Sequence, residues 1–205
     1  MKVFDFSTWT FDERVGEIRA VAGPDSIVVG YSMGGRLALH AALGCSWPGL
    51  VVVGASAGIA DAGERRRRRE ADAALADWIE AHAIDEVVAR WERNPVFASQ
   101  PGWLVDAQRP GRLGHAPAEL ARLLRSAGQG ALEPIWDRLS SLEMPVLALA
   151  GEHDSTYRAA SERIAGLAPR GRAGVIAGAG HAAHLEAPAA VADAILGFAG
   201  EFSSL

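Results

Sequence analysis

The chain has 205 residues, 49% of them hydrophobic, which is enough to bury one substantial core in a single compact domain. Its net charge of −5 and the lack of a long basic stretch interleaved with aromatic residues argue against nucleic-acid binding. The N-terminus has no apolar signal region, no segment approaches the ~18 apolar residues of a membrane span, and the one cysteine, Cys45, cannot form an internal disulfide. These features predict a cytoplasmic protein without a membrane partner.

Apolar strands and helix-forming runs alternate at both ends of the chain. Thr10 and Glu13 have the spacing of a capping box, which predicts a helix to about Val21. The later apolar runs lack alternation, as is typical of parallel strands covered on both faces, so the pattern predicts an α/β fold. The predicted strands are Lys2–Phe6, Ile27–Val29, Leu50–Gly54, Met144–Gly151 and Ala173–Ile176, with core helices at Tyr157–Leu167 and Pro188–Phe202.

The middle of the chain shows helical spacing and no convincing strand. We therefore predict a core made of residues 1–58 and 143–205, and an inserted helical cap made of residues 59–142. Because the insertion follows the third predicted strand, on the same side of the sheet as the candidate site, the cap is expected to cover that site and select the substrate. The predicted cap helices are Glu64–Ala83, Asp85–Arg93, Pro117–Ser126 and Pro134–Leu142.

A glycine-flanked serine follows the second predicted strand. Gly30-Tyr31-Ser32-Met33-Gly34 has the form G-x-S-x-G, in which small residues allow a tight turn from strand to helix. Gly30 and Gly34 are expected to supply that freedom, because side chains there would collide as the chain reverses. The helix N-terminus favours a nearby oxyanion, so Ser32 is a candidate nucleophile or base and Met33 N–H a candidate oxyanion donor. The alternative is a glycine-rich turn with an incidental serine.

A serine of this kind needs a base and an acid that orients the base. Asp154 and His181 each follow a predicted strand, so both are expected at the same rim of the sheet as Ser32, in the chain order of α/β-hydrolases. The simpler interpretations are a helix-capping aspartate and a surface-loop histidine. Glu152 and Asp193 are alternative partners for the histidine.

Six stretches between about residue 27 and the C-terminus share a pattern with one known group. They are Val29–Arg36, Ala55–Ile59, Asn94–Ser99, Leu124–Gly130, Ala150–Tyr157 and Ala179–Pro188. In these stretches the chain resembles the menaquinone-pathway lyases of the α/β-hydrolase superfamily, the 2-succinyl-6-hydroxy-2,4-cyclohexadiene-1-carboxylate synthases. Three features are more particular to this group: the arginine after the glycines of the serine turn, the Pro-Val-Phe-Ala-Ser run, and the Ala-Gly-His-x-x-His-x-Glu-x-Pro form of the histidine loop.

The resemblance implies elimination rather than hydrolysis, with no cofactor and no metal. A Ser-His-Asp set removes a proton from a small anionic substrate, pyruvate leaves, and the oxyanion hole holds the developing enolate. Such a substrate carries several carboxylates, which guanidinium groups bind in bidentate fashion. The resemblance points to Arg36, to Arg68 or Arg69 and, more weakly, to Arg109. The arginine run is equally typical of a solvated helix face with i,i+4 ion pairs.

The chain departs from this group in two places. Thr156-Tyr157 stands where a lysine-aromatic step is usual, and only 31 residues precede Ser32, so the loop that ordinarily donates the second oxyanion N–H is missing. We predict that Lys2–Phe6 pairs beside Ile27–Val29, which gives a truncated α/β-hydrolase fold with a five-strand, mainly parallel sheet. Phe6 would then be the second oxyanion donor.

Two other functions remain open at this point. The same three residues would serve an esterase or thioesterase through an acyl-enzyme. A shortened N-terminus would also be compatible with a binding protein that has lost catalysis. The exact substrate, the natural start of the chain and a homo-oligomeric state are not determined by the sequence.

Overall fold

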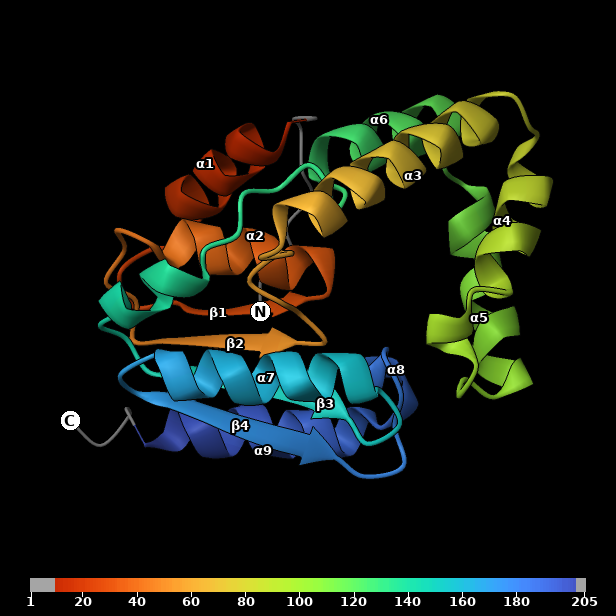
Figure 1. The fold of residues 1–205 in the computed structure, drawn as a ribbon. Helices are drawn as coiled ribbons and strands as arrows, with labels where there is room; N and C mark the ends of the chain where they lie inside the picture. Colours follow the sequence, from red (N-terminus) through yellow and green to blue (C-terminus); the bar gives the residue numbers. More distant parts are fainter. Residues whose placement is uncertain (1–9, 202–205) are drawn as a thin grey trace.

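The computed structural model describes residues 10–201, which form a parallel sheet with helices on both faces (Figure 1). In this part of the chain the sheet has four strands in the order β1-β2-β3-β4. They are β1 Ile27–Tyr31, β2 Gly49–Val53, β3 Val146–Gly151 and β4 Gly171–Ile176. Four predicted strands are thus confirmed, with small shifts at their ends. The fifth, Lys2–Phe6, lies outside the described residues, together with Phe6 and its expected pairing beside β1.

The two central strands are buried on both sides. Leu50 and Val52 of β2 pack in one apolar cluster, whereas Val51 and Val53 pack in another on the opposite face. Consecutive strand residues point to opposite faces, so both faces must be apolar, and this explains the runs without alternation. The first cluster is covered by α1 Phe11–Val21, α2 Met33–Ala42 and α7 Ser155–Leu167, the second by α9 Pro188–Gly200.

The start of α1 has the predicted capping box. The Thr10 hydroxyl accepts a hydrogen bond from Glu13 N at 3.3 Å, and the Glu13 carboxylate accepts one from Thr10 N at 3.2 Å. Both bonds satisfy amide groups that the first helical turn leaves unpaired. Helix α1 packs along α2, and Phe11, Val15 and Ile18 form its buried stripe.

Residues 59–142 contain helices and no strand. Figure 1 shows α3 and α6 lying side by side above the sheet, while α4 and α5 turn away from them. Helix α5 was not predicted, because Gly102, Pro110 and Gly111 weaken the helical signal of its sequence. The elements are α3 Ala62–Glu80, α4 Ile84–Glu92, the 3-10 turn η1 Pro95–Phe97, α5 Gly102–Leu113, α6 Pro117–Ala127 and the 3-10 helix η2 Trp136–Ser141.

The last part of this segment returns to the sheet. Ile135, Trp136 and Leu139 are buried in the same apolar cluster as α2, and η2 contacts α7. The predicted helix Pro134–Leu142 is therefore a 3-10 helix whose apolar residues complete the core. None of the helices formed by residues 10–201 is long and apolar enough to cross a membrane.

Candidate active site

Ser32 stands at the sharp turn between β1 and α2. Its φ of 49° and ψ of −111° make it the one non-glycine residue with positive φ in the described part of the chain. A residue with a side chain rarely adopts this backbone conformation, which costs of order 1–3 kcal/mol and is typical of functional sites. The amide of Ser32 donates to Val53 O at 2.8 Å, so the neighbouring strand β2 holds the turn in place.

The glycines around Ser32 differ from the sequence prediction in one position. A Cβ on Gly30 would lie 2.5 Å from Gly34 O, and a Cβ on Gly35 would lie 2.5 Å from the Ala55 Cβ. A Cβ on Gly34 would meet no atom of residues 10–201 within 4 Å. Gly30 is therefore required as predicted, but Gly35 takes the role expected of Gly34, because it is Gly35 that faces the strands.

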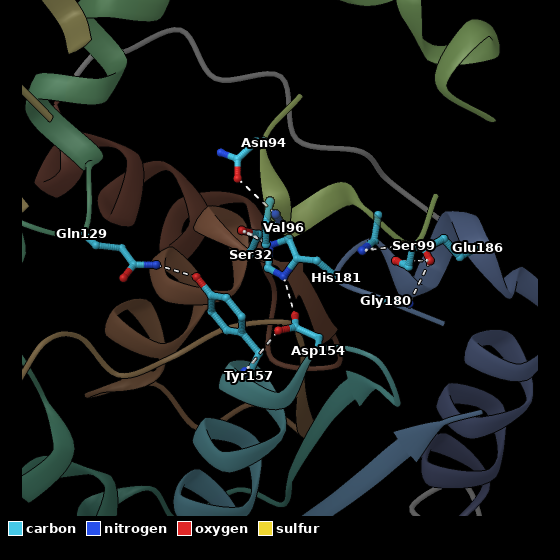
Figure 2. Close-up of polar contacts among 11 residues, drawn as sticks. Ser32, Asn94, Val96, Ser99, Gln129, Asp154, Tyr157, Gly180, His181 and Glu186 are labelled. Atoms are coloured by element: carbon cyan, nitrogen blue, oxygen red, sulfur yellow. Dashed lines mark hydrogen bonds and ion pairs between the residues drawn. The ribbon is translucent and has the colours of Figure 1, made fainter. Parts of the chain in front are cut away.

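Ser32, His181 and Asp154 form a continuous chain of hydrogen bonds (Figure 2). His181 Nε2 lies 3.1 Å from Ser32 Oγ, and His181 Nδ1 lies 2.7 Å from Asp154 Oδ2. The side chains of His181 and Asp154 are buried, which strengthens the bond between them. We call these three residues the Ser-His-Asp chain. In this geometry the imidazole can accept the serine proton while the carboxylate stabilises the resulting charge.

Asp154 makes the contacts expected for both of the roles considered for it. It is the N-cap of α7, where Oδ1 accepts a hydrogen bond from Tyr157 N at 3.3 Å, while Oδ2 faces the histidine. The cap therefore fixes the carboxylate in the orientation that His181 needs. Glu152, considered as an alternative partner, instead accepts a hydrogen bond from Gly178 N at 2.8 Å.

Aromatic rings surround His181. The rings of Tyr157, Tyr31 and Phe97 have centroids 4.6, 5.3 and 6.2 Å from the imidazole. Burial is the main cause that raises the pKa of the Tyr31 hydroxyl above its usual value, so this group stays protonated. The Tyr157 hydroxyl accepts a hydrogen bond from Gln129 Nε2 at 2.5 Å (Figure 2). These rings shield one side of the imidazole from water.

Arg36 lies one helical turn after Ser32 and is buried. Its Nη2 donates to Ala127 O at 3.2 Å, whereas its Nε has no hydrogen-bond partner among the described residues. No carboxylate within residues 10–201 forms an ion pair with it. Burial lowers the pKa of the guanidinium, and the nearby charge of Arg68 acts in the same direction. A buried cation of this kind favours binding of an anion.

The predicted cap arginines Arg68 and Arg69 have different surroundings. Arg68 forms an ion pair with the buried Asp72 at 2.7 Å, at the i,i+4 spacing, and its side chain stays 45% exposed. Arg69 Nε donates to Gly130 O at 3.0 Å, which joins α3 to the loop before η2. Arg68 therefore keeps an exposed guanidinium close to Arg36, whereas Arg69 serves mainly to join two segments.

On α5, Arg109 and Arg112 share one carboxylate. Both form ion pairs with Glu92 of α4. The guanidinium of Arg112 also lies 5.9 Å from the centre of the Phe97 ring, and its charge lowers the pKa of Tyr31, against the larger effect of burial. Sequence reasoning selected Arg109. In the structure it is Arg112 that lies near Phe97 and Tyr31, two of the rings beside His181.

Comparison with known proteins identifies the family of the chain. The profile of the alpha/beta hydrolase family matches residues 4–194. The chain belongs to the alpha/beta hydrolase family. Within that family it is 35% identical over 168 residues to a putative 2-succinyl-6-hydroxy-2,4-cyclohexadiene-1-carboxylate synthase of Bacillus subtilis, which covers 78% of this chain and 61% of the relative. It therefore spans about three fifths of that relative's length.

Two further members of the family cover more of the chain. The synthase of the same name from Serratia proteamaculans is 32% identical over 196 residues, which are 92% of this chain and 75% of the relative. The structure of MenH from S. aureus superposes with a TM-score of 0.91 at 30% identity and covers 99% of this chain and 80% of that one. The predicted α/β-hydrolase fold and the resemblance to this group are confirmed.

Of the two oxyanion donors expected from the sequence, one lies within the described residues. Met33 is the first residue of α2, so its N–H belongs to the amides that a helix leaves without an intrahelical acceptor. The second expected donor, Phe6, lies outside the described residues. Sequence reasoning missed Tyr31, Phe97 and Arg112, although the first adjoins Ser32 and the second lies in a stretch that carried the resemblance.

Proposed function

We propose that the protein is a carbon-oxygen lyase that eliminates pyruvate from a polycarboxylate, the activity that its resemblance to the 2-succinyl-6-hydroxy-2,4-cyclohexadiene-1-carboxylate synthases implies. The observation that carries this proposal is the buried Arg36 one turn after Ser32, which lacks a carboxylate partner among residues 10–201. A hydrolase of neutral esters would have no use for a buried cation beside its serine, whereas a substrate carboxylate would compensate its charge.

The Ser-His-Asp chain would act as the base in this reaction. His181 Nε2 takes the proton of Ser32, and the serine oxygen removes a proton from a substrate carbon adjacent to a carbonyl group. Electrons of the broken C–H bond form the enolate, and as the enolate collapses the C–O bond to the enolpyruvyl group breaks. The departing enolpyruvate takes up a proton and becomes pyruvate. The reaction needs no oxidant and no cofactor.

Backbone N–H groups and arginines around the Ser-His-Asp chain would bind the substrate and stabilise the enolate. Met33 N–H would stabilise the enolate oxygen, and Phe6 remains the proposed second donor. Arg36 and the exposed guanidinium of Arg68 would bind carboxylates, and Arg112 would contribute from α5. Arg69 and Arg109 are weaker candidates. Arg69 bonds to Gly130 O, and of the two α5 arginines that pair with Glu92 it is Arg112 that lies over the Phe97 ring.

The test adds the enolpyruvyl precursor of 2-succinyl-6-hydroxy-2,4-cyclohexadiene-1-carboxylate to the purified protein. A coupled dehydrogenase that consumes pyruvate then measures its release. We expect one pyruvate for each substrate consumed, and loss of turnover in Ser32→Ala. Absence of pyruvate release by the wild-type protein would overturn the lyase assignment. The Ser32→Ala variant also serves as the control for spontaneous elimination of the precursor.

The other functions are distinct outcomes of the same experiment. A burst of phenol release from aryl esters, as an acyl-enzyme forms on Ser32, would identify an esterase or thioesterase if no pyruvate is released from the precursor. Binding of the precursor without turnover, unchanged in Ser32→Ala, would identify a binding protein.

A further inference from the structure

The carboxylate of Glu186 holds both sides of the histidine in the Ser-His-Asp chain. It accepts hydrogen bonds from Gly180 N at 2.8 Å and from Ala182 N at 3.1 Å, the amides immediately before and after His181. A third bond comes from the hydroxyl of Ser99 at 3.0 Å (Figure 2). Glu186 ends the short helix α8 Ala183–Glu186, so one side chain closes the loop on itself and also reaches another segment.

The histidine loop is fixed from the opposite side by the end of β3. A Cβ on Gly151 would lie 2.1 Å from Gly180 O, and His153 N donates to Ala179 O at 2.9 Å. The backbone on the N-terminal side of His181 therefore lies between β3 and the Glu186 carboxylate. Reorientation of the imidazole through its backbone requires the loss of at least one of these bonds.

The third bond connects this loop with the helical segment 59–142. Ser99 packs against the loop so closely that a Cβ on Gly180 would lie 1.8 Å from Ser99 Oγ. The same stretch carries Phe97, whose ring faces His181, and Asn94 Oδ1 holds its turn by accepting from Val96 N at 3.1 Å (Figure 2). The segment thus reaches His181 in two ways, through a ring contact and through Glu186.

We propose that Glu186 is a positioning residue that couples the helical segment 59–142 to the orientation of His181. A carboxylate that accepts several bonds holds them more firmly than neutral acceptors would, because its hydrogen bonds are charge-assisted. When Ser99 contacts the carboxylate, the carboxylate is fixed between that segment and the loop, and His181 Nε2 faces Ser32. The proposal rests on the catalytic use of the Ser-His-Asp chain and is independent of the substrate.

Two kinds of variant distinguish the backbone hydrogen bonds of Glu186 from its hydrogen bond with Ser99. In Glu186→Gln the amide group must face either Ala182 N or the pair of donors Gly180 N and Ser99 Oγ, so it loses a backbone bond in either orientation. Ser99→Ala removes only the hydrogen bond between the helical segment and Glu186, whereas Ser99→Thr keeps a hydroxyl at this position. Ser141→Ala is the matched control, since among residues 10–201 its exposed hydroxyl bonds only to Arg138 O within η2.

The experiment measures the rate at which a small fluorophosphonate labels Ser32. In this reaction Ser32 Oγ bonds to phosphorus, fluoride leaves and the serine proton passes to His181, so the rate reports on the orientation of the histidine without a substrate. We expect a fall of about 30-fold in Glu186→Gln and Glu186→Ala and about threefold in Ser99→Ala. Ser99→Thr and Ser141→Ala should label at nearly the wild-type rate, and thermal unfolding identifies variants that fail to fold.

A double variant decides whether Ser99 acts through the carboxylate. Adding Ser99→Ala to Glu186→Ala should change the rate no further, because the hydroxyl has lost its acceptor. Multiplied effects in the double variant, or labelling of Ser99→Ala at the wild-type rate, would overturn the coupling. A wild-type protein that is never labelled would overturn the proposed catalytic chain and this coupling with it. A labelled protein without pyruvate release would contradict only the lyase assignment.

Discussion

The sheet region and the helical segment 59–142 hold their charged groups in opposite ways. Around the sheet, Ser32, Asp154 and His181 each follow a strand, and each is held by backbone: a strained turn, a helix cap and a clamped loop. In residues 59–142 several arginines project from helices and pair with nearby carboxylates, as Arg68 does with Asp72 and Arg109 with Glu92. The first arrangement permits one geometry, whereas the second can exchange its partners.

This difference indicates how the two regions divide the work. Proton transfer requires donors and acceptors at hydrogen-bond distance, which backbone constraints at strand ends provide. Under the proposed function, substrate carboxylates would replace protein carboxylates on the arginines of the helical segment. Arg36 is the exception, because it belongs to the sheet region and forms no ion pair within residues 10–201.

The largest expected effect comes from breaking the backbone-held geometry at Asp154. Asp154→Asn keeps the N-cap acceptor but places an amide against His181 Nδ1, which favours the wrong tautomer and should lower kcat by about 10⁴-fold. Pyruvate release measures this loss. Glu152→Gln and Asp193→Asn are controls, and a large loss in either of them with Asp154→Asn nearly silent would show that the acid is misassigned.

The glycines at the elbow test how tightly the same region is packed. Gly30→Ala introduces a Cβ 2.5 Å from a backbone oxygen, so it should lower the free energy of unfolding by roughly 3 kcal/mol. Gly34→Ala meets nothing within 4 Å among residues 10–201 and should change it by less than about 1 kcal/mol. Urea unfolding compares the two variants, and equal losses would restore the sequence prediction that both flanking glycines are required.

Histidines extend the comparison to pH. Burial lowers the pKa of His40 in α2 to about 4, so the folded protein favours its neutral form. Stability from this group is complete above the unfolded pKa of about 6.5 and is lost as the pH falls toward 4, by roughly 2 kcal/mol after allowance for partial exposure of the ring. His40→Gln should remove this part of the pH dependence of unfolding, while His184, whose pKa burial also lowers, keeps its own contribution. His115→Gln, at an exposed position between α5 and α6, should retain the contribution of His40.

The smallest expected effect separates the two arginines of α5. Arg112→Ala should raise KM about tenfold, because the guanidinium near Phe97 is proposed to bind a substrate carboxylate. Arg109→Ala should change KM less than about twofold, since Glu92 retains Arg112 as a partner. Steady-state pyruvate release gives both constants. A larger effect of Arg109→Ala would return the substrate contact to the residue that the sequence favoured.

The Ser-His-Asp chain could be predicted from the sequence because strand ends determine it. Apolar runs identify buried parallel strands, and parallel strands bring the residues after their ends to one rim. Asp154 and His181 follow such runs, so their proximity to Ser32 needed only the strand order. The capping box of α1 was equally predictable, since it depends on residues three positions apart.

Contacts between distant segments that are not set by strand ends could not be predicted from the sequence. Gly34 and Gly35 are adjacent, and only the packing against Ala55 shows which of them excludes a side chain. Helix α5 was not predicted either, because its proline and glycines have low helix propensity and tertiary packing stabilises the helix. Local sequence gives no information on the neighbour that a side chain meets after the chain has folded.

The sequence by itself determined the fold class, the order of the strands along the chain and the three residues of the Ser-His-Asp chain, because periodicity and turn chemistry act over a few residues. Only the tertiary structure decided that Asp154 caps a helix and faces His181 at once, that Glu186 binds Ser99, and that Arg112 faces Phe97. Ser99 and Glu186 lie 87 positions apart. Such pairs form only when packing of the sheet and the helices brings their segments together, and no local propensity encodes that approach.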